Sequence, residues 1–285
     1  MADQRLPAKV IAVIDDLYAS LQQQLPPGTL RSIYIYGSTA LGAYVEGTSD
    51  IDFVAFLTRS LRSEEIAKVE QVHRNVDSRW LKLDLMGAYI RLEDFGKPAQ
   101  AGETVTYFAR ALHTNLRGAD LNPITWRVMR EAGICAAGEP LELPDCVSDE
   151  ELLQYVIGNM NTYWQGWIQK LAEWPAEAVE TNALEEAVEW CVLGMLRQLY
   201  TIRERNITSK PGAGEYGLER LPAQWHGLIQ AAIQIKLGES GALPNSSDST
   251  DVRRKLLGLL RHIHKAANAD YQAFLLYRQR MSDGS

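Results

Sequence analysis

The chain has 285 residues, of which 46% are hydrophobic and 23% are charged. This composition is ordinary for a globular protein, and the length is enough for two hydrophobic cores. Charges, glycines and prolines break every apolar stretch after a few residues, which argues against a membrane-spanning helix. The formal net charge of -7 argues against a nucleic-acid backbone as the main partner, because phosphate binding usually requires a basic face. An acidic balance suits a cationic small molecule instead.

The amino terminus and the cysteines indicate a cytoplasmic protein. Residues Met1 to Arg5 lack a basic region that leads into an apolar stretch, so no export signal is visible. The three cysteines, Cys135, Cys146 and Cys191, are scattered and form no CxxC pair. Such a set argues against a disulfide framework or a zinc site and fits a reducing compartment. We therefore expect a cytoplasmic protein without a membrane or nucleic-acid partner, and we expect a monomer.

The first half of the chain alternates between helical and extended patterns. Apolar residues at helical spacing begin at Val10, and Pro26-Pro27-Gly28 ends that segment. Short segments rich in β-branched and aromatic residues then predict strands. The expected elements, in chain order, are a helix over 10–25, strands over 32–36 and 51–57, a helix over 63–80 and a strand over 81–90. Strands and helices that alternate in this way indicate a layered α/β or α+β structure.

After about Pro144 the pattern becomes long and helical. Ser148 is a suitable cap for the first of these helices, with Glu151 three residues further on. Lys210-Pro211-Gly212 is expected to lie in a loop. The further helices are expected over 182–205, 218–237 and 249–280.

This change of pattern divides the chain into two domains, and the predicted fold class is α+β. The first domain, residues 1–145, is expected to be a mixed β-sheet with flanking helices. The second domain, residues 146–285, is expected to be an all-α helical bundle.

Two short motifs in the first half suggest chemistry with phosphates. Gly37-Ser38 follows a predicted strand; glycine permits close approach of a phosphate, and the backbone N–H groups and the serine hydroxyl can donate to it. Asp50 and Asp52 stand two residues apart at the next strand, so their side chains project to the same face. Oxygen ligands grouped in this way suit Mg²⁺, which commonly binds one or two carboxylates together with substrate phosphates.

A third acid, Asp84, stands between Leu83 and Leu85 in the predicted third strand. If that strand lies beside the second, the carboxylates of Asp50, Asp52 and Asp84 could converge. Metal ions held there would orient an in-line displacement at phosphorus and neutralise the developing charge. A lone Asp-x-Asp or a lone Gly-Ser pair more often has a structural role, but their combination favours an active site.

This combination resembles the polymerase-β-like nucleotidyltransferase superfamily, which has a Gly-Ser pair, a short spacer, Asp-x-Asp and a later carboxylate. The resemblance implies a mixed sheet with flanking helices, two magnesium ions and an NTP as the donor. Gly37 and Ser38 would then hold the triphosphate, and Asp50 and Asp52 would bind the metals and serve catalysis. Asp84 would take the place of the third carboxylate, either as the general base or as a third metal ligand.

The second half is similar to the helical domain of the aminoglycoside (3'')(9) adenylyltransferases, which inactivate streptomycin and spectinomycin by adding AMP. The similarity is carried by Glu219–Trp225, by Leu196–Tyr200 and by Lys210. It implies that Arg197 and Lys210 reach the phosphates of ATP. Cations near a triphosphate would stabilise the charge of the transition state. A solvated helix face is the alternative explanation for both residues.

The same resemblance suggests residues that contact the acceptor. Asn161–Trp164 resembles the family segment whose tryptophan packs against the drug, so Trp164 is a candidate, with core packing as the alternative. The acids that pair with cationic groups of the drug have no unambiguous match, and Glu185 and Glu186, together with Glu189, are the candidate substitutes. Because residues 177–189 are longer than the family pattern, spectinomycin or an acceptor outside both drugs is favoured over streptomycin.

We therefore expect a magnesium-dependent nucleotidyltransferase that transfers AMP from ATP to a hydroxyl of an aminoglycoside or aminocyclitol antibiotic and releases pyrophosphate. Two alternatives stay open. The first is a nucleotidyltransferase that modifies a protein or another metabolite. The second is a non-catalytic nucleotide-binding module, which is disfavoured because all three carboxylates are present.

Overall fold

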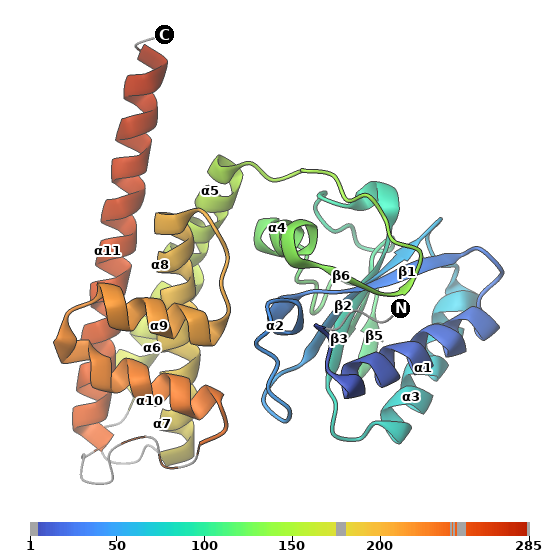
Figure 1. The fold of residues 1–285 in the computed structure, drawn as a ribbon, viewed down its shortest axis with the longest axis horizontal. Coiled ribbons are helices and arrows are strands. Elements are labelled where there is room, and N and C mark those ends of the chain that lie inside the picture. Colours follow the sequence, from blue (N-terminus) through green and yellow to red (C-terminus); the bar gives the residue numbers. More distant parts are fainter. Residues whose placement is uncertain (1–4, 175–180, 240, 242, 244–248, 284–285) are drawn as a thin grey trace. The chain divides into compact units, whose positions relative to one another are not determined.

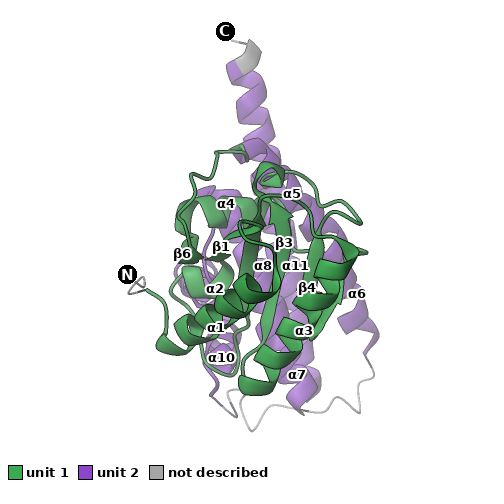
Figure 2. Cartoon of the chain, turned by 90° about the vertical axis from the view of Figure 1, so that its right-hand side faces the viewer, with its two compact units in different colours: residues 1–148 green, residues 149–285 purple. Residues whose placement is uncertain are grey.

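The computed structural model describes residues 5–174, 181–239, 241, 243 and 249–283. The chain divides into two compact units, residues 1–148 and residues 149–285, which Figure 2 colours separately. The boundary predicted from the sequence lies between residues 145 and 146. Met1 to Gln4, which form most of the segment without an export signal, lie outside the described residues.

The first unit is a mixed β-sheet with flanking helices. Its strands lie in the order β5-β4-β3-β2-β1-β6. β2 and β3 run parallel, and the other neighbouring pairs run antiparallel. The bounds are α1 (Ala8–Gln24), β1 (Leu30–Ile35), α2 (Gly37–Ala40), β2 (Ile51–Leu57), α3 (Ser63–Arg79), β3 (Leu85–Arg91), the 3₁₀ turn η1 (Leu92–Asp94), β4 (Val105–Phe108), β5 (Ala111–His113), α4 (Pro123–Ala132) and β6 (Ile134–Gly138).

The two faces of this sheet are covered by different elements. α1 and α3 lie side by side along one face (Figure 1), and Phe53 of β2 is part of the core they share. Because strand side chains alternate between faces, Phe56 projects to the other side. There its ring lies 5.5 Å from the ring of Tyr34 and 6.2 Å from that of Phe95. Trp126 of α4 packs on Phe95 at 4.9 Å between ring centroids, so this face has an aromatic core of its own.

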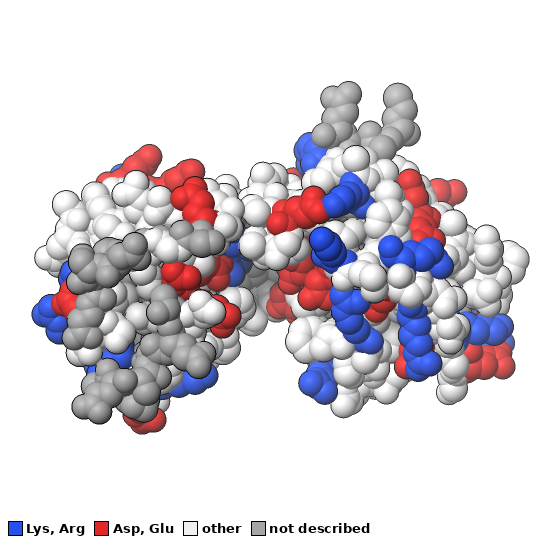
Figure 3. Space-filling view, turned by 90° about the horizontal axis from the view of Figure 1, so that it is seen from below, with Lys and Arg blue, Asp and Glu red and all other residues white. Residues whose placement is uncertain are grey.

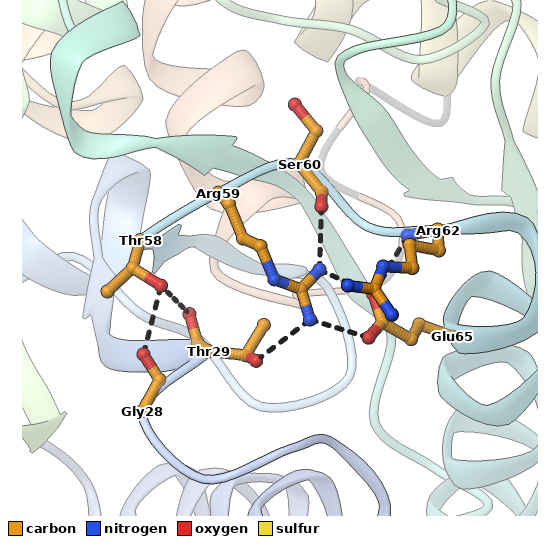
Figure 4. A network of polar contacts seen from close by, with 7 residues as sticks. All are labelled: Gly28, Thr29, Thr58, Arg59, Ser60, Arg62 and Glu65. Atoms are coloured by element: carbon orange, nitrogen blue, oxygen red, sulfur yellow. Dashed lines mark hydrogen bonds and ion pairs between the residues drawn. The ribbon is translucent and has the colours of Figure 1, made fainter.

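A polar network closes the carboxyl end of β2 (Figure 4). The Arg59 guanidinium donates to both carboxylate oxygens of Glu65, at 2.6 and 2.7 Å. Glu65 also accepts a hydrogen bond from Arg62 N at 2.8 Å, at the start of α3. Arg59 donates to Ser60 O at 3.0 Å and to Thr29 Oγ1 at 3.4 Å. The hydrogen bonds from Arg59 are the main reason that the pKa of the buried Glu65 carboxyl falls to about 2.

The second unit is helical. α11 packs along α5, α6 and α8, while α10 packs on α7 and α9. The bounds are α5 (Asp149–Asn159), the π-helical turn η2 (Met160–Trp164), α6 (Gln165–Glu173), α7 (Thr181–Val188), the π-helical turn η3 (Glu189–Leu193), α8 (Gly194–Glu204), α9 (Lys210–Arg220), the 3₁₀ turn η4 (Ala223–Trp225), α10 (His226–Lys236) and α11 (Ser249–Asp283). The predicted fold class, a mixed-sheet domain followed by a helical domain, is confirmed.

Two long helices of this unit contain a π-helical turn. η2 joins α5 to α6, and η3 joins α7 to α8, with helical backbone angles on both sides of each turn. Trp164 of η2 packs against Gly194, the first residue of α8, so closely that a Cβ at position 194 would overlap its indole ring. Single π-helical turns inside α-helices are rare and are often found at functional sites.

The structure differs from the sequence prediction at the start of one strand and within one predicted helix. β3 begins at Leu85, so Asp84 precedes the strand instead of lying within it. The helix predicted over 218–237 is interrupted after Arg220, because Pro222 lacks an N–H group and disfavours a helical residue before it. Accordingly, Leu221 has extended backbone angles.

The segment Lys210-Pro211-Gly212 was expected to be a loop, and this expectation is wrong. These residues form the first turn of α9, where the side chain of Ser209 accepts a hydrogen bond from Gly212 N at 3.1 Å. A proline is well tolerated in the first turn of a helix, because its missing N–H group would have no helical partner there.

The surface of α1 and α3 is of mixed charge. Figure 3 shows basic side chains of the first unit next to acidic ones. Arg74 pairs with Glu70 at 2.7 Å, and Arg79 pairs with Asp16 at 2.8 Å. Among the described residues, no helix is both long enough and apolar enough to cross a membrane.

Candidate active site

The Gly37-Ser38 motif forms a tight turn between β1 and the short helix α2. Gly37 has a φ of 63°, a conformation that glycine adopts readily and other residues rarely adopt. A Cβ at this position would overlap Asp52 Oδ2. Tyr36 N donates to Asp52 O at 3.1 Å, which ties the turn to the start of β2. Both the backbone conformation and the adjacent carboxylate therefore require glycine at position 37.

Ser38 contributes a hydroxyl group that no described residue uses. Its Oγ is buried and has no hydrogen-bond partner, although its backbone carbonyl accepts from Ala43 N at 2.9 Å. Buried hydroxyls usually have a partner, since an unpaired one costs roughly 1–3 kcal/mol. An anion with oxygen acceptors at this turn would supply the missing partner.

The three predicted acids lie at one end of the neighbouring strands β2 and β3. Ile51 is opposite Leu85 in the parallel register, and Ile51 N donates to Asp84 O at 2.7 Å. Asp84 therefore stands beside Asp50, and side chains at such positions project to the same face. That face is the one opposite α1 and α3. Asp52 is 8% exposed and Asp84 is exposed.

The electrostatics of Asp84 reflect these neighbours. Desolvation raises the pKa of the Asp84 carboxyl above its usual range, and the negative charges of Asp50 and Asp77 add to the increase. The Arg110 guanidinium acts in the opposite direction. A carboxyl surrounded by like charges is stabilised in its charged form when a cation binds nearby. This end of the sheet therefore favours the binding of a cation.

The acids at this end of the sheet can be compared with the ligands that magnesium usually binds. No three histidine, cysteine, aspartate or glutamate side chains in the described part of the chain form a cluster that could hold a metal ion by themselves. Mg²⁺ usually keeps several waters and binds through one or two carboxylates plus substrate phosphates. Asp50 and Asp52, with the Gly37-Ser38 turn against Asp52, fit that mode. Asp84 as a third ligand or as the general base stays a prediction.

Two residues near the site were not anticipated from the sequence. Burial raises the pKa of the Tyr36 hydroxyl well above its usual range, and the charges of Asp52, Asp120 and Asp50 add to this increase. Asp120 is exposed and precedes α4, far from the motif in sequence. Tyr36 directly precedes Gly37, which is the signal that could have identified it.

Arg110 is the third residue that sequence reasoning missed. It lies in the two-residue turn between β4 and β5, where Ala109 and Arg110 have φ of 51° and 59°. Its Nη2 lies 3.3 Å from Leu81 O and 3.4 Å from Leu83 O. Two-residue hairpin turns that fit the twist of a β-sheet commonly require positive φ at both of their residues. Here the turn carries a guanidinium to the segment that holds Asp84.

In the second unit, Lys210 is the predicted residue with the most defined surroundings. Its Nζ donates to Glu189 Oε1 at 2.9 Å and lies 4.5 Å from the centre of the Trp190 ring. Arg197 lies on α8 and is half-buried. Glu185 is half-buried and Glu186 is exposed, both on α7.

Trp164 is buried in the core of this unit. It is 5% exposed, and its ring fills the space left by Gly194. Packing accounts for this position, and a contact of Trp164 with an acceptor stays a prediction. The exposed rings beside it belong to Tyr163 and Trp190, with 45% and 40% exposure. They are joined by a hydrogen bond from Trp190 Nε1 to Tyr163 Oη at 3.0 Å.

Comparisons with known proteins give a family match in each of the two units. Residues 15–92 match the nucleotidyltransferase domain family. Residues 152–256 match the family described as aminoglycoside adenylyltransferase, C-terminal domain. No sequence among curated proteins matches this chain.

A solved structure shares the fold of this chain over almost the whole length of the solved protein. It is the crystal structure of spectinomycin adenyltransferase AAD(9) from Enterococcus faecialis with ATP and spectinomycin. The superposition has a TM-score of 0.59 at 15% sequence identity and covers 88% of this chain and 98% of that chain. At this identity the likeness concerns the fold alone. The two family matches, one in each unit, show that the chain is an aminoglycoside adenylyltransferase-like nucleotidyltransferase.

Proposed function

We propose that the chain transfers AMP from ATP to a hydroxyl group of a cationic aminocyclitol or aminoglycoside, with release of pyrophosphate. The observation that carries this proposal is the Gly37-Ser38 turn, in which Gly37 lies against the Asp52 carboxylate and the Ser38 hydroxyl is buried without a partner. A turn that can bind a phosphate and a carboxylate that can bind a metal ion are thus adjacent. The AAD(9) structure with ATP and spectinomycin supports the choice of ATP as donor and of this class of acceptor.

In this proposal the first unit binds the triphosphate and the metal. The Ser38 hydroxyl donates to a phosphate oxygen, and Gly37 leaves room for the phosphate to approach the backbone. Asp50 and Asp52 hold magnesium, which when bound orients the phosphates and offsets the charge that develops in the transition state. The Mg²⁺-binding mode of two carboxylates and substrate oxygens matches the residues present.

The reaction then requires a proton acceptor for the attacking hydroxyl. Asp84 is our candidate, because it projects from the same face as Asp50 and Asp52 and its raised pKa makes it a better base than an ordinary carboxylate. The acceptor oxygen forms a bond to the α-phosphorus of ATP as the bond to pyrophosphate breaks, and the hydroxyl proton passes to Asp84. Arg197 and Lys210 are proposed to contribute positive charge to the triphosphate.

An acceptor screen tests this function. The purified chain is incubated with ATP, Mg²⁺ and one compound at a time, and pyrophosphate release is measured with spectinomycin, streptomycin and a broader aminoglycoside panel. We expect release with at least one cationic aminocyclitol or aminoglycoside, and a product heavier than that acceptor by one AMP group. Removal of Mg²⁺ with EDTA abolishes the release, and added Mg²⁺ restores it.

The outcomes of the screen separate the remaining alternatives. ATP binding without turnover on any compound contradicts the antibiotic acceptor. In that case labelled ATP and cell-extract proteins show whether the AMP group is transferred to a protein. Binding of ATP without transfer to any acceptor, protein or small molecule, would instead identify a nucleotide-binding module.

A further inference from the structure

We propose that Glu189 and Trp190 are positioning residues that hold the Lys210 ammonium ready to receive the triphosphate. This inference rests on the proposed function, in which Lys210 binds ATP. Glu189 belongs to the candidate acceptor-binding acids of the sequence analysis, and its contact with Lys210 gives it a different role.

The ion pair between Lys210 and Glu189 is more sheltered than an ordinary surface pair. The two charged atoms are 2.9 Å apart, and the side chains are only 19% and 15% exposed. Exposed pairs contribute little because water screens them and because both side chains lose rotamer freedom. Here burial reduces the screening, and the lysine is held in one place by a short hydrogen bond.

Trp190 restricts the same ammonium from a second direction. Lys210 Nζ lies 4.5 Å from the centre of the indole ring, within the range of a cation–π interaction. The ring is itself fixed, because Trp190 Nε1 donates to Tyr163 Oη at 3.0 Å. A lysine ammonium has three N–H groups, of which Glu189 uses one. The contacts shown leave donors for a phosphate oxygen.

The local backbone explains how these groups come together. Glu189 and Trp190 are the first two residues of the π-helical turn η3, which packs against α9. Lys210 is the first residue of α9, whose start is fixed by the Ser209 side chain. The lysine thus extends from a capped helix end toward a widened helical turn. Glu189 and Trp190, which contact the lysine, therefore both belong to a helical segment.

Holding the lysine matters because of its flexibility. A lysine side chain carries about 2 kcal/mol of rotamer entropy, which a free side chain loses when it binds a phosphate. When the ion pair and the indole ring have already ordered it, this loss does not fall on ATP binding. Glu189 and Trp190 should therefore strengthen ATP binding only through Lys210.

A double-mutant cycle tests this dependence. Binding of ATP in the presence of Mg²⁺ is measured by titration calorimetry for the full chain, for Glu189→Gln, for Lys210→Ala and for the double variant. We expect Glu189→Gln to weaken binding about tenfold in the native background, and less than twofold in the Lys210→Ala background. Glu215→Gln, an exposed acid on α9, removes the same charge and should leave the affinity unchanged.

Trp190 provides a second route if Glu189→Gln does not fold, as judged by circular dichroism. Trp190→Ala should weaken ATP binding several-fold, and Trp190→Phe, which keeps an aromatic face, should restore most of the affinity. In the Lys210→Ala background neither change should have an effect larger than twofold.

Three results would contradict the inference or its basis. An equal loss from Glu189→Gln in both backgrounds means that the carboxylate acts independently of Lys210. Unchanged or tighter ATP binding in Glu189→Gln means that the ion pair does not prepare the lysine for the triphosphate. If the native chain binds no ATP at all, the proposed function fails first, and the inference falls with it.

Discussion

An acidic side chain lies near each end of strand β2, and the pKa values of the two are shifted in opposite directions. At its carboxyl end, Glu65 is held by Arg59, and its pKa falls to about 2. At its amino end, next to Asp50 and Asp52, desolvation and neighbouring negative charges raise the pKa of Asp84. The first carboxyl has its partners within the protein, as Figure 4 shows. The second lies near other acids, at the end of the sheet where the Ser38 hydroxyl has no partner among the described residues.

This difference separates a group that serves stability from groups that serve binding. A carboxylate whose hydrogen bonds are complete makes no further favourable contact with a ligand. Removing such a carboxylate weakens the folded state. A site whose polar groups are incomplete is costly in the free protein and gains when a ligand completes it. Natural proteins retain such costs chiefly at functional sites. The following substitutions test whether the two ends of β2 differ in this way.

The largest effect is expected for Asp52→Asn. It removes a negative charge next to the Gly37 turn while keeping the size of the side chain, so we expect the catalytic rate to fall rather than the packing to change. We expect the rate of pyrophosphate release to fall by about 10³-fold. Asp145→Asn, which removes a surface acid, should change this rate by less than about twofold. A native rate in Asp52→Asn would place the active site elsewhere.

Gly37→Ala tests the closeness of the turn to Asp52. The new Cβ would overlap Asp52 Oδ2, and φ is 63°, so we expect a loss of about 3 kcal/mol in the free energy of unfolding together with loss of ATP binding. Gly42→Ala is the matched control, because Gly42 has φ of 70° and no atom within 4 Å of the added Cβ. It should cost only about 1–2 kcal/mol. Urea denaturation measures both; equal losses would show that the overlap with Asp52 is relieved without cost.

Glu65→Gln tests the other end of the strand. Removing one partner of a sheltered pair should lower the free energy of unfolding at pH 7 by about 2–3 kcal/mol, with no change in ATP binding. Because the pKa of Glu65 is lowered from 4.5 to about 2 in the folded state, the stabilisation is complete above pH 4.5 and disappears as the pH falls toward 2. The difference between native chain and variant should therefore shrink between pH 5 and pH 3 in urea denaturation.

The exposed neighbour Glu64 provides the control for this prediction. Glu64→Gln removes the same charge from the same helical turn and should change the free energy of unfolding by less than about 0.5 kcal/mol. If Glu64→Gln and Glu65→Gln behaved alike, the network around Arg59 would not be the source of the stability.

Ser38→Ala should have the smallest effect and the most specific one. Its hydroxyl is buried without a partner in the free protein, so we expect Ser38→Ala to raise the free energy of unfolding by about 1 kcal/mol while the binding of ATP becomes roughly fivefold weaker. Ser49→Ala should do the reverse, because Ser49 Oγ accepts a hydrogen bond from Val45 N at 3.1 Å. Calorimetry and urea denaturation of the two variants give this comparison; a stability loss in Ser38→Ala would mean that its hydroxyl serves the fold.

The sequence predicts the first unit well where residue patterns are local. β1, β2 and the Gly37-Ser38 turn follow from short β-branched stretches and one glycine, and the even spacing of Asp50 and Asp52 is enough to place them on one face. Asp84 was placed inside a strand because Leu81, Leu83 and Leu85 alternate, although Leu81 is 73% exposed and β3 starts only at Leu85. Alternation alone does not show which apolar residues are buried.

The contributions of distant residues could not be predicted in the same way. Arg110, in the β4–β5 turn, acts on Asp84, and Asp120, in the segment before α4, acts on Tyr36. Neither segment has a sequence pattern that predicts these neighbours. In the second unit, the pairing of Lys210 with Glu189 depends on a π-helical turn. Sequence periodicity near 3.6 residues does not distinguish such a turn from an α-helix.

The π-helical turns also have a consequence for the comparison of related chains. A π-helical turn contains one residue more than the α-helix that would replace it, and one residue corresponds to about 100° of rotation around a helix axis. Deleting a single residue from 189–193 would let η3 become regular helix and would rotate Glu189 and Trp190 away from Lys210 or turn all of α8. In alignments of relatives, a one-residue gap within 189–193 should therefore mark chains that hold this lysine in a different way.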